Sequence, residues 1–138
     1  MNTKKIVWYI GLTALLIGVG QTVAIEYSLY WSLWWYDIVM HFLGGLWIAL
    51  IALWAYKAFA GEDAESNKGY LTALIIVVVV GILWEVMEIL VGLTLTQANY
   101  EMDTVLDLIM DVVGAICAAR LVFRRTVINK HIKIEEHV

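Results

Sequence analysis

The stretch LTALIIVVVVGILWEVMEILVGLTL, which runs from Leu71 to Leu95, decides the fold of this chain. Its only charged side chains are Glu85 and Glu88, and it is longer than the roughly 20 residues with which a helix crosses a bilayer. The valine run Val77–Val80 would favour a strand in water. In lipid, every backbone polar group must be satisfied within the segment, which favours a helix. We therefore predict that this stretch is a transmembrane helix.

Three other stretches are apolar over a similar length. They are Ile6–Ile25, Ile38–Phe59 and Val105–Phe123. The 138-residue chain is 62% hydrophobic and 16% charged, against about 25% charged in an average soluble domain, so it lacks the polar surface of a soluble protein. Cys117 is the only cysteine and the net charge is −4, which excludes a disulfide scaffold and argues against nucleic acid as a partner. The sequence therefore predicts an all-α integral membrane protein, a four-helix bundle in contact with the lipid bilayer.

Positive charges predict the direction of the four spans. All nine Lys and Arg residues precede the first span, lie in or beside the loop 60–69, or end and follow the fourth span. By the positive-inside rule both termini are then cytoplasmic, and the aromatic residues of 27–36 form a belt at the outer interface. We expect a multi-pass protein of the cell membrane whose first helix is a span rather than a secretory signal. Residues 1–125 form its four-helix transmembrane domain, with hairpins at 6–59 and 71–123, and residues 126–138 are a cytoplasmic tail.

The second and fourth spans share a sequence pattern. Residues Asp37–Gly45, DIVMHFLGG, align without a gap on Asp107–Ala115, DLIMDVVGA, at an offset of 70 residues. One two-helix hairpin would thus occur twice in parallel, related by an axis along the membrane normal. We expect Gly44 and Gly114 to occupy equivalent close-packed positions. Small residues spaced four apart also predict close helix contacts; the pairs are Ala14/Gly18, Gly45/Ala49 and Gly114/Ala118.

Six ionisable side chains in or beside the spans form a candidate cluster, although a charged group costs about 2.5–3.5 kcal/mol at the centre of a membrane helix. They are Asp37, His41, Glu85, Glu88, Asp107 and Asp111. Three helices each carry two of them, three or four residues apart, so each pair forms one stripe. All six fall in the outer half of the predicted bilayer. We expect His41, Glu85, Glu88 and Asp111 to converge in one pocket, with Asp37 and Asp107 at its mouth.

This cluster has five carboxylates and one imidazole, with no Lys or Arg at the same level. Carboxylates this close cannot all be ionised without a compensating charge, so they either share protons or bind a divalent metal. The predicted metal ligands are His41, Glu85, Glu88 and Asp111, a set that suits Mg, Mn, Fe or Zn. Glu88 or Asp111 is the candidate general base. Asp37 and Asp107 also fit simple helix caps, and His41 also fits a hydrogen-bonded core histidine.

The same motifs resemble those of the VanZ-like and YjdF-like families of small bacterial membrane proteins. The matching segments are Asp37-x-x-x-His41 with Gly44, Trp84-Glu85-x-x-Glu88, and Asp107-x-x-x-Asp111-x-x-Gly114-Ala115. The resemblance covers about residues 36–118. It implies a role in the cell envelope, because VanZ itself is linked to glycopeptide resistance, and it implies no established reaction.

Two classes of function fit these features. The first is a cation-dependent enzyme or binding protein that acts at the outer leaflet on a lipid-linked or envelope substrate. The second is a proton- or cation-coupled transporter, with the same acids as the coupling site. A structural membrane subunit, alone or as an oligomer, is a third. A polar path through the inner half would favour transport, but the inner halves of the third and fourth spans are almost wholly apolar.

Overall fold

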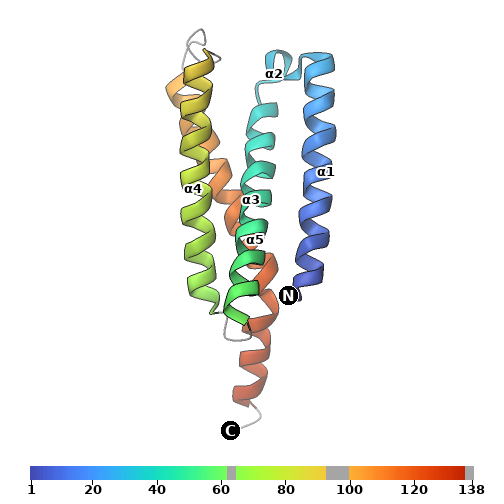
Figure 1. Ribbon diagram of the computed structural model, residues 1–138, viewed down its shortest axis with the longest axis vertical. Coiled ribbons are helices and arrows are strands. Elements are labelled where there is room, and N and C mark those ends of the chain that lie inside the picture. Colours follow the sequence, from blue (N-terminus) through green and yellow to red (C-terminus); the bar gives the residue numbers. More distant parts are fainter. Residues whose placement is uncertain (62–64, 93–99, 136–138) are drawn as a thin grey trace.

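The computed structural model describes residues 1–61, 65–92 and 100–135, and the side chains of these residues up to position 123. The elements of this part are α-helices, as the sequence predicts. They are α1 (Thr3–Tyr27), α2 (Leu29–Ser32), α3 (Tyr36–Ala60), α4 (Ser66–Val91) and α5 (Tyr100–Glu135). Figure 1 shows α1, α3, α4 and α5 as long helices that follow the long axis of the molecule.

Among the described residues, α1, α3 and α4 are long and apolar enough to cross a membrane. These three helices contain the first two predicted spans and most of the third. The fourth predicted span lies within α5, whose apolar stretch is interrupted by Asp107, Asp111 and Arg120, and α5 does not meet the same criterion. Several apolar helices thus identify a membrane protein, and a fourth span that completes a four-helix bundle stays a prediction.

The residues at which α1 begins and α4 ends are explained by local side-chain and backbone chemistry. The side chain of Asn2 accepts a hydrogen bond from the backbone N–H of Lys4 and so begins α1, as an N-cap residue does. Gly92 ends α4 with φ 76° and ψ 19°, a left-handed conformation that glycine adopts without steric cost. The third span is predicted to reach Leu95, but α4 ends at Val91. Residues 93–99 lie outside the part that the structure describes.

The aromatic segment of residues 27–36 joins α1 to α3 through the single turn of α2. Ser28, with φ 54° and ψ 42°, turns the chain from α1 into α2. The Tyr36 hydroxyl donates a hydrogen bond to the Gly20 carbonyl (2.8 Å), which ties the start of α3 to α1. Trp31 and Trp34 are highly exposed, as expected for rings that lie at a membrane interface.

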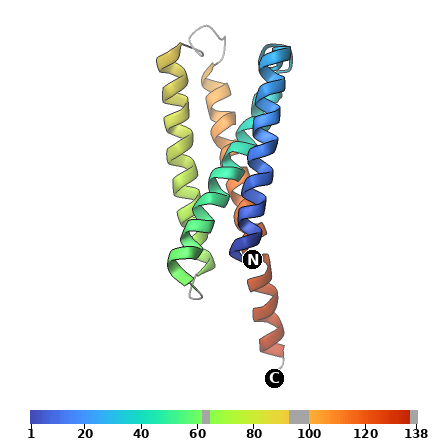
Figure 2. The same cartoon turned by 45° about the vertical axis from the view of Figure 1, so that its right-hand side comes forward.

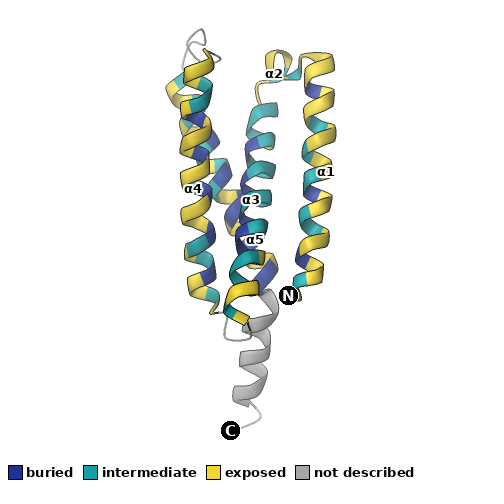
Figure 3. Cartoon of the chain, in the orientation of Figure 1, coloured by how far each residue is buried: buried dark blue, intermediate teal, exposed yellow. Residues whose placement is uncertain are grey.

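The α3 helix occupies the centre of the molecule. It packs most extensively on α5, and it also contacts α4 and α1 (Figures 1 and 2). Most of the α1 surface is exposed (Figure 3), although the Met1 ammonium donates a hydrogen bond to the Val122 carbonyl (2.7 Å). The helices therefore form a core of α3, α4 and α5, with α1 attached along one side of α3.

Small residues bring α3 and α5 together. A Cβ atom at Gly45 would overlap the main chain of Asp111, and one at Gly114 would overlap the Phe42 carbonyl. Gly44, by contrast, has no atom within 4 Å of the place a Cβ would take. The prediction that Gly44 and Gly114 are equivalent close-packed positions is therefore wrong for Gly44. The reason is that α3 faces α5 along the stripe of every fourth residue that includes Gly45, and Gly44 points about 100° away from it.

Below this crossing lies the apolar core. Its buried members are Ile6, Ala49, Leu50, Ala52, Leu53, Ala73, Val77, Ala115, Ala118, Ala119, Val122 and Phe123. The predicted small-residue pairs Gly45/Ala49 and Gly114/Ala118 are buried here. Gly18 is exposed instead, because the Ala14/Gly18 pair lines a shallow cavity on the surface of α1.

The lysines of α1, α3 and α4 share one end of the molecule. Lys4 and Lys5 begin α1, Lys57 lies in the last turn of α3, and Lys68 lies in the first turn of α4. These helix ends gather around the N-terminus, at the lower end in Figure 1. The predicted acidic cluster belongs to the opposite half, because it comes from the first turns of α3 and α5 and the last turns of α4.

Candidate functional site

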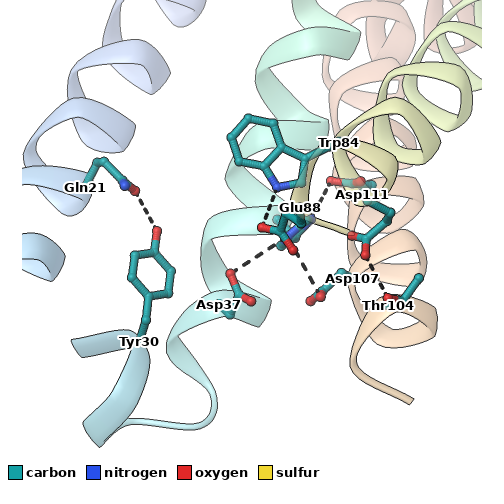
Figure 4. A network of polar contacts seen from close by, with 10 residues as sticks. Gln21, Tyr30, Asp37, Trp84, Glu88, Thr104, Asp107 and Asp111 are labelled. Atoms are coloured by element: carbon teal, nitrogen blue, oxygen red, sulfur yellow. Dashed lines mark hydrogen bonds and ion pairs between the residues drawn. The ribbon is translucent and has the colours of Figure 1, made fainter. Parts of the chain in front are cut away.

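His41 on α3 lies among three aspartates. Its Nε2 atom is 3.8 Å from Asp37 Oδ1 and 3.9 Å from Asp107 Oδ2, and its Nδ1 atom is 3.5 Å from Asp111 Oδ1. The imidazole is buried, as are Asp107 and Asp111. Figure 4 shows the side chains of Asp37, Asp107, Asp111 and Glu88 gathered in one place.

Helix periodicity and the glycine crossing together produce this arrangement. Asp37 and His41 are one turn apart on α3, and Asp107 and Asp111 are one turn apart on α5, so each pair occupies one face. At Gly45 the backbones of α3 and α5 meet without an intervening side chain. The two stripes are therefore close enough for His41 to contact carboxylates on both helices.

Helix α4 closes the cluster from the third side. A Cβ atom at Gly81 would lie 2.6 Å from Asp111 Oδ2, so the glycine leaves the space that the Asp111 carboxylate occupies. Glu85 is buried one turn further along α4, and its Oε2 accepts a hydrogen bond from the Thr104 hydroxyl of α5 (2.8 Å). Asp111 thus contacts His41 on one side and approaches α4 on the other.

Glu88 is the accessible glutamate of the cluster. It is half-buried, and its Oε1 accepts a hydrogen bond from the indole N–H of Trp84 (2.9 Å). Because Trp84 itself is exposed, Glu88 lies between the buried acids and the outside of the protein.

Two buried carboxylate oxygens in the described part of the chain have no hydrogen-bond partner. They are Glu85 Oε1 and Asp107 Oδ1. A buried acceptor without a partner costs about 1–3 kcal/mol, and each of these belongs to an acid of the cluster. Among the described side chains no Lys or Arg pairs with these acids either. The cluster therefore has acceptor atoms and negative charge that a bound cation would satisfy.

The atoms best placed to hold a metal ion differ from the predicted set. One ligand atom each from Asp37, His41 and Asp107 lies within 4.8 Å of the other two. The sequence places Asp37 and Asp107 at the mouth, yet Asp107 is only 2% exposed, whereas the Asp37 side chain is 32% exposed. The helix crossing buries Asp107 against His41. The structure does bring all six predicted residues into one region.

Several contributors were missing from the sequence prediction. Thr104 lies three residues before Asp107 and seven before Asp111, so helical spacing places it on the same stripe and would have identified it. Gly81 gave no such signal, because its role depends on which residue α5 presents to it. The described part has two cavities, one between α4 and α5 and one on α1, and neither is the pocket that the sequence predicts for the acids.

Beside the cluster, a hydrogen bond joins α2 to α1. The Tyr30 hydroxyl donates to Gln21 Oε1 at 2.6 Å, and Figure 4 shows this pair apart from the acids. Burial and the nearby Asp37 carboxylate raise the pKa of Tyr30 to about 12. The phenol therefore keeps its proton and remains a donor at neutral pH.

Comparison with protein families gives one informative match. A family model described as "Predicted membrane protein (DUF2238)" matches residues 2–127. Neither the curated proteins nor the solved structures contain a match to this chain. The family match agrees with the expected family of small membrane proteins, and the VanZ-like label stays a prediction.

Proposed function

The chain belongs to the DUF2238 family of predicted membrane proteins, and from this premise we propose that it binds a divalent cation. The cation is held by Asp37, His41 and Asp107 in the outer half of the membrane. The protein is then a cation-dependent enzyme or binding protein, and its substrate is a lipid-linked or envelope molecule.

The observation that carries this proposal is the position of the imidazole. His41 turns Nε2 toward Asp37 and Asp107 and turns Nδ1 toward Asp111. Metal-binding histidines commonly direct their second nitrogen at a carboxylate, which fixes the ring and makes it a better ligand. Asp111, which the sequence suggested as a ligand or base, fits the role of that carboxylate.

The donor set suits the chemistry. Two carboxylates and one imidazole are ligands for Mg, Mn, Fe or Zn, and the unpartnered Asp107 Oδ1 adds another acceptor. A divalent cation supplies Lewis acidity toward a phosphoryl or carbonyl oxygen, or activates water. Glu88 is the candidate base, because it is half-buried and the Trp84 indole orients its carboxylate.

The distribution of charge supports a placement in the cell membrane with both termini in the cytoplasm. Lys4, Lys5, Lys57 and Lys68 lie at one end of the helices, which the positive-inside rule assigns to the cytoplasm. The acids of the cluster then belong to the outer half, where an envelope or lipid-linked substrate can reach them.

Transport through the molecule is the weaker alternative. The apolar core lies between the cluster and the basic end of the molecule, and its members include Ala49, Leu53, Val77 and Val122. A coupled transporter needs polar groups along its path. This packing favours a site that binds or reacts on one side of the membrane.

Elemental analysis of the purified full chain tests the proposal. We expect a stoichiometric divalent metal in the native protein, and its loss in His41→Ala and in Asp107→Asn. Glu101→Gln is the matched control, because Glu101 is an exposed acid in the first turn of α5, and it should keep the metal.

A native protein without metal, even after incubation with Mg, Mn, Fe and Zn salts, would contradict the proposal. Shared protons would then neutralise the acids. In that case the melting temperature should hold at mildly acidic pH and fall as the pH rises and the protons leave.

A further inference from the structure

A second feature lies between the acid cluster and the basic end of the molecule. A cavity of about 310 Å³ opens between α4 and α5, a volume at the lower end of the roughly 300–1,000 Å³ of small-molecule sites. Its lining residues are Asn67, Tyr70, Leu71 and Leu74 of α4 and Ala115, Ile116 and Ala119 of α5.

The cavity is an apolar groove with a small-residue floor. Ala115 and Ala119 are buried and leave the space, while Leu71, Leu74 and Ile116 are partly exposed and form its sides. Its two polar side chains, Asn67 and Tyr70, lie in the first turns of α4. The groove is therefore apolar along its length and polar at the end where the basic residues lie.

Two basic residues lie near that polar end. The Lys57 ammonium is 5.3 Å from the centroid of the Phe123 ring, and Phe123 stacks on Tyr70 with centroids 5.6 Å apart. Arg120 is exposed. It lies four residues after Ile116, and this spacing places both residues on the same face of α5. Within the described side chains neither Lys57 nor Arg120 forms an ion pair with a carboxylate.

We propose that this groove binds one anionic phospholipid, with an acyl chain between α4 and α5 and its phosphate at Arg120 and Lys57. Basic pockets between membrane helices on the cytoplasmic side bind anionic headgroups, and tyrosine favours the interfacial depth. A second copy of the chain fits less well, because the basic residues of one copy would then face those of the other and repel them. This inference is independent of the metal proposal, because no residue of the acid cluster takes part.

Native mass spectrometry of the full chain in detergent tests the charge requirement. Dioleoyl phosphatidylglycerol and dioleoyl phosphatidylcholine are titrated separately, and we expect one phosphatidylglycerol to be retained preferentially. Arg120→Gln should weaken that lipid by about fivefold, the effect of one basic residue near an anionic surface. Lys4→Gln removes an exposed charge from the same end of the molecule, on α1, and should leave the affinity unchanged.

Two filling variants test the groove itself. Ile116→Trp on α5 and Leu74→Trp on α4 should each prevent retention of the lipid, whereas Leu15→Trp on the exposed side of α1 should not. Circular dichroism and a monodisperse elution profile identify the variants that fold. One folded filling variant is enough for the test. Four results would each overturn the proposal. They are equal affinity for the two lipids, equal effects of Arg120→Gln and Lys4→Gln, retention of the lipid by a folded filling variant, and a dimer in place of the lipid-bound chain.

Discussion

At the scale of single residues, each side chain around His41 has a distinct position. Asp37 is the most exposed of the three aspartates and Asp107 the most buried, and both lie on the Nε2 side of the ring. Asp111 lies on the Nδ1 side, between α3 and Gly81 of α4. We therefore expect a different effect from the replacement of each of the three aspartates.

Asp111→Asn should weaken the cation by about 10–100-fold without abolishing its binding, because the loss of a carboxylate behind a metal-binding histidine has this effect. Asp107→Asn, which removes a direct ligand in the proposed site, should weaken the cation further. Competition with a chromophoric chelator measures both affinities. Equal losses in the two variants would contradict the separate roles.

At the scale of helices, the crossing of α3 and α5 determines the geometry of the cluster. Gly45 faces the main chain of Asp111, and Gly114 faces that of Phe42. Both helices begin at the same end of the molecule (Figures 1 and 2), as the predicted duplication of a hairpin requires. The crossing lies within the segments that align at the offset of 70 residues, but Gly44, which aligns with Gly114, is not close-packed, so the duplication stays a prediction.

Two neighbouring glycines offer a matched test of this crossing. Gly45→Ala should lower the free energy of unfolding by about 1–3 kcal/mol, the usual cost of overpacking. Gly44→Ala should be neutral or stabilise the protein by up to about 1 kcal/mol, because it adds helix propensity in open space. Unfolding by sodium dodecyl sulfate, followed by circular dichroism, compares the two, and a larger loss at Gly44 would refute the packing.

Local periodicity was enough to predict the long helices and to group the acids of each helix on one stripe. Apolar length identified α1, α3 and α4, and spacings of three and four residues identified the acids of each stripe. The choice of Gly45 over Gly44, and the burial of Asp107, depend on how α3 is rotated about its own axis. That rotation is set by the neighbouring helices, and no spacing within one helix reports it.

At the scale of the whole molecule, the two ends differ in chemistry. One end carries the lysines of α1, α3 and α4, and the other carries the acid cluster and exposed aromatic rings such as Trp31 and Trp34. The apolar core separates them. This polarity is the physical basis for the proposed orientation.

Single cysteines report that orientation directly. In a chain with Cys117→Ser, Tyr27→Cys lies on the aromatic side and Lys68→Cys on the basic side, and both positions are exposed. A membrane-impermeant maleimide should label Tyr27→Cys in intact cells and label Lys68→Cys only after lysis. The reverse pattern would overturn the orientation.

The attachment of α1 along one side of α3 has a consequence for how the chain is inserted during synthesis. The α1 helix leaves the ribosome before its neighbour α3, and its own apolar length is enough to hold it in lipid. The last long helix, α5, carries Asp107 and Asp111, which would be costly in lipid alone. The helices that carry His41, Gly45 and Gly81 precede α5 along the chain, so they leave the ribosome before those acids do. The order of the helices along the chain thus lets α5, the helix that carries these acids, pack against helices that are synthesised before it.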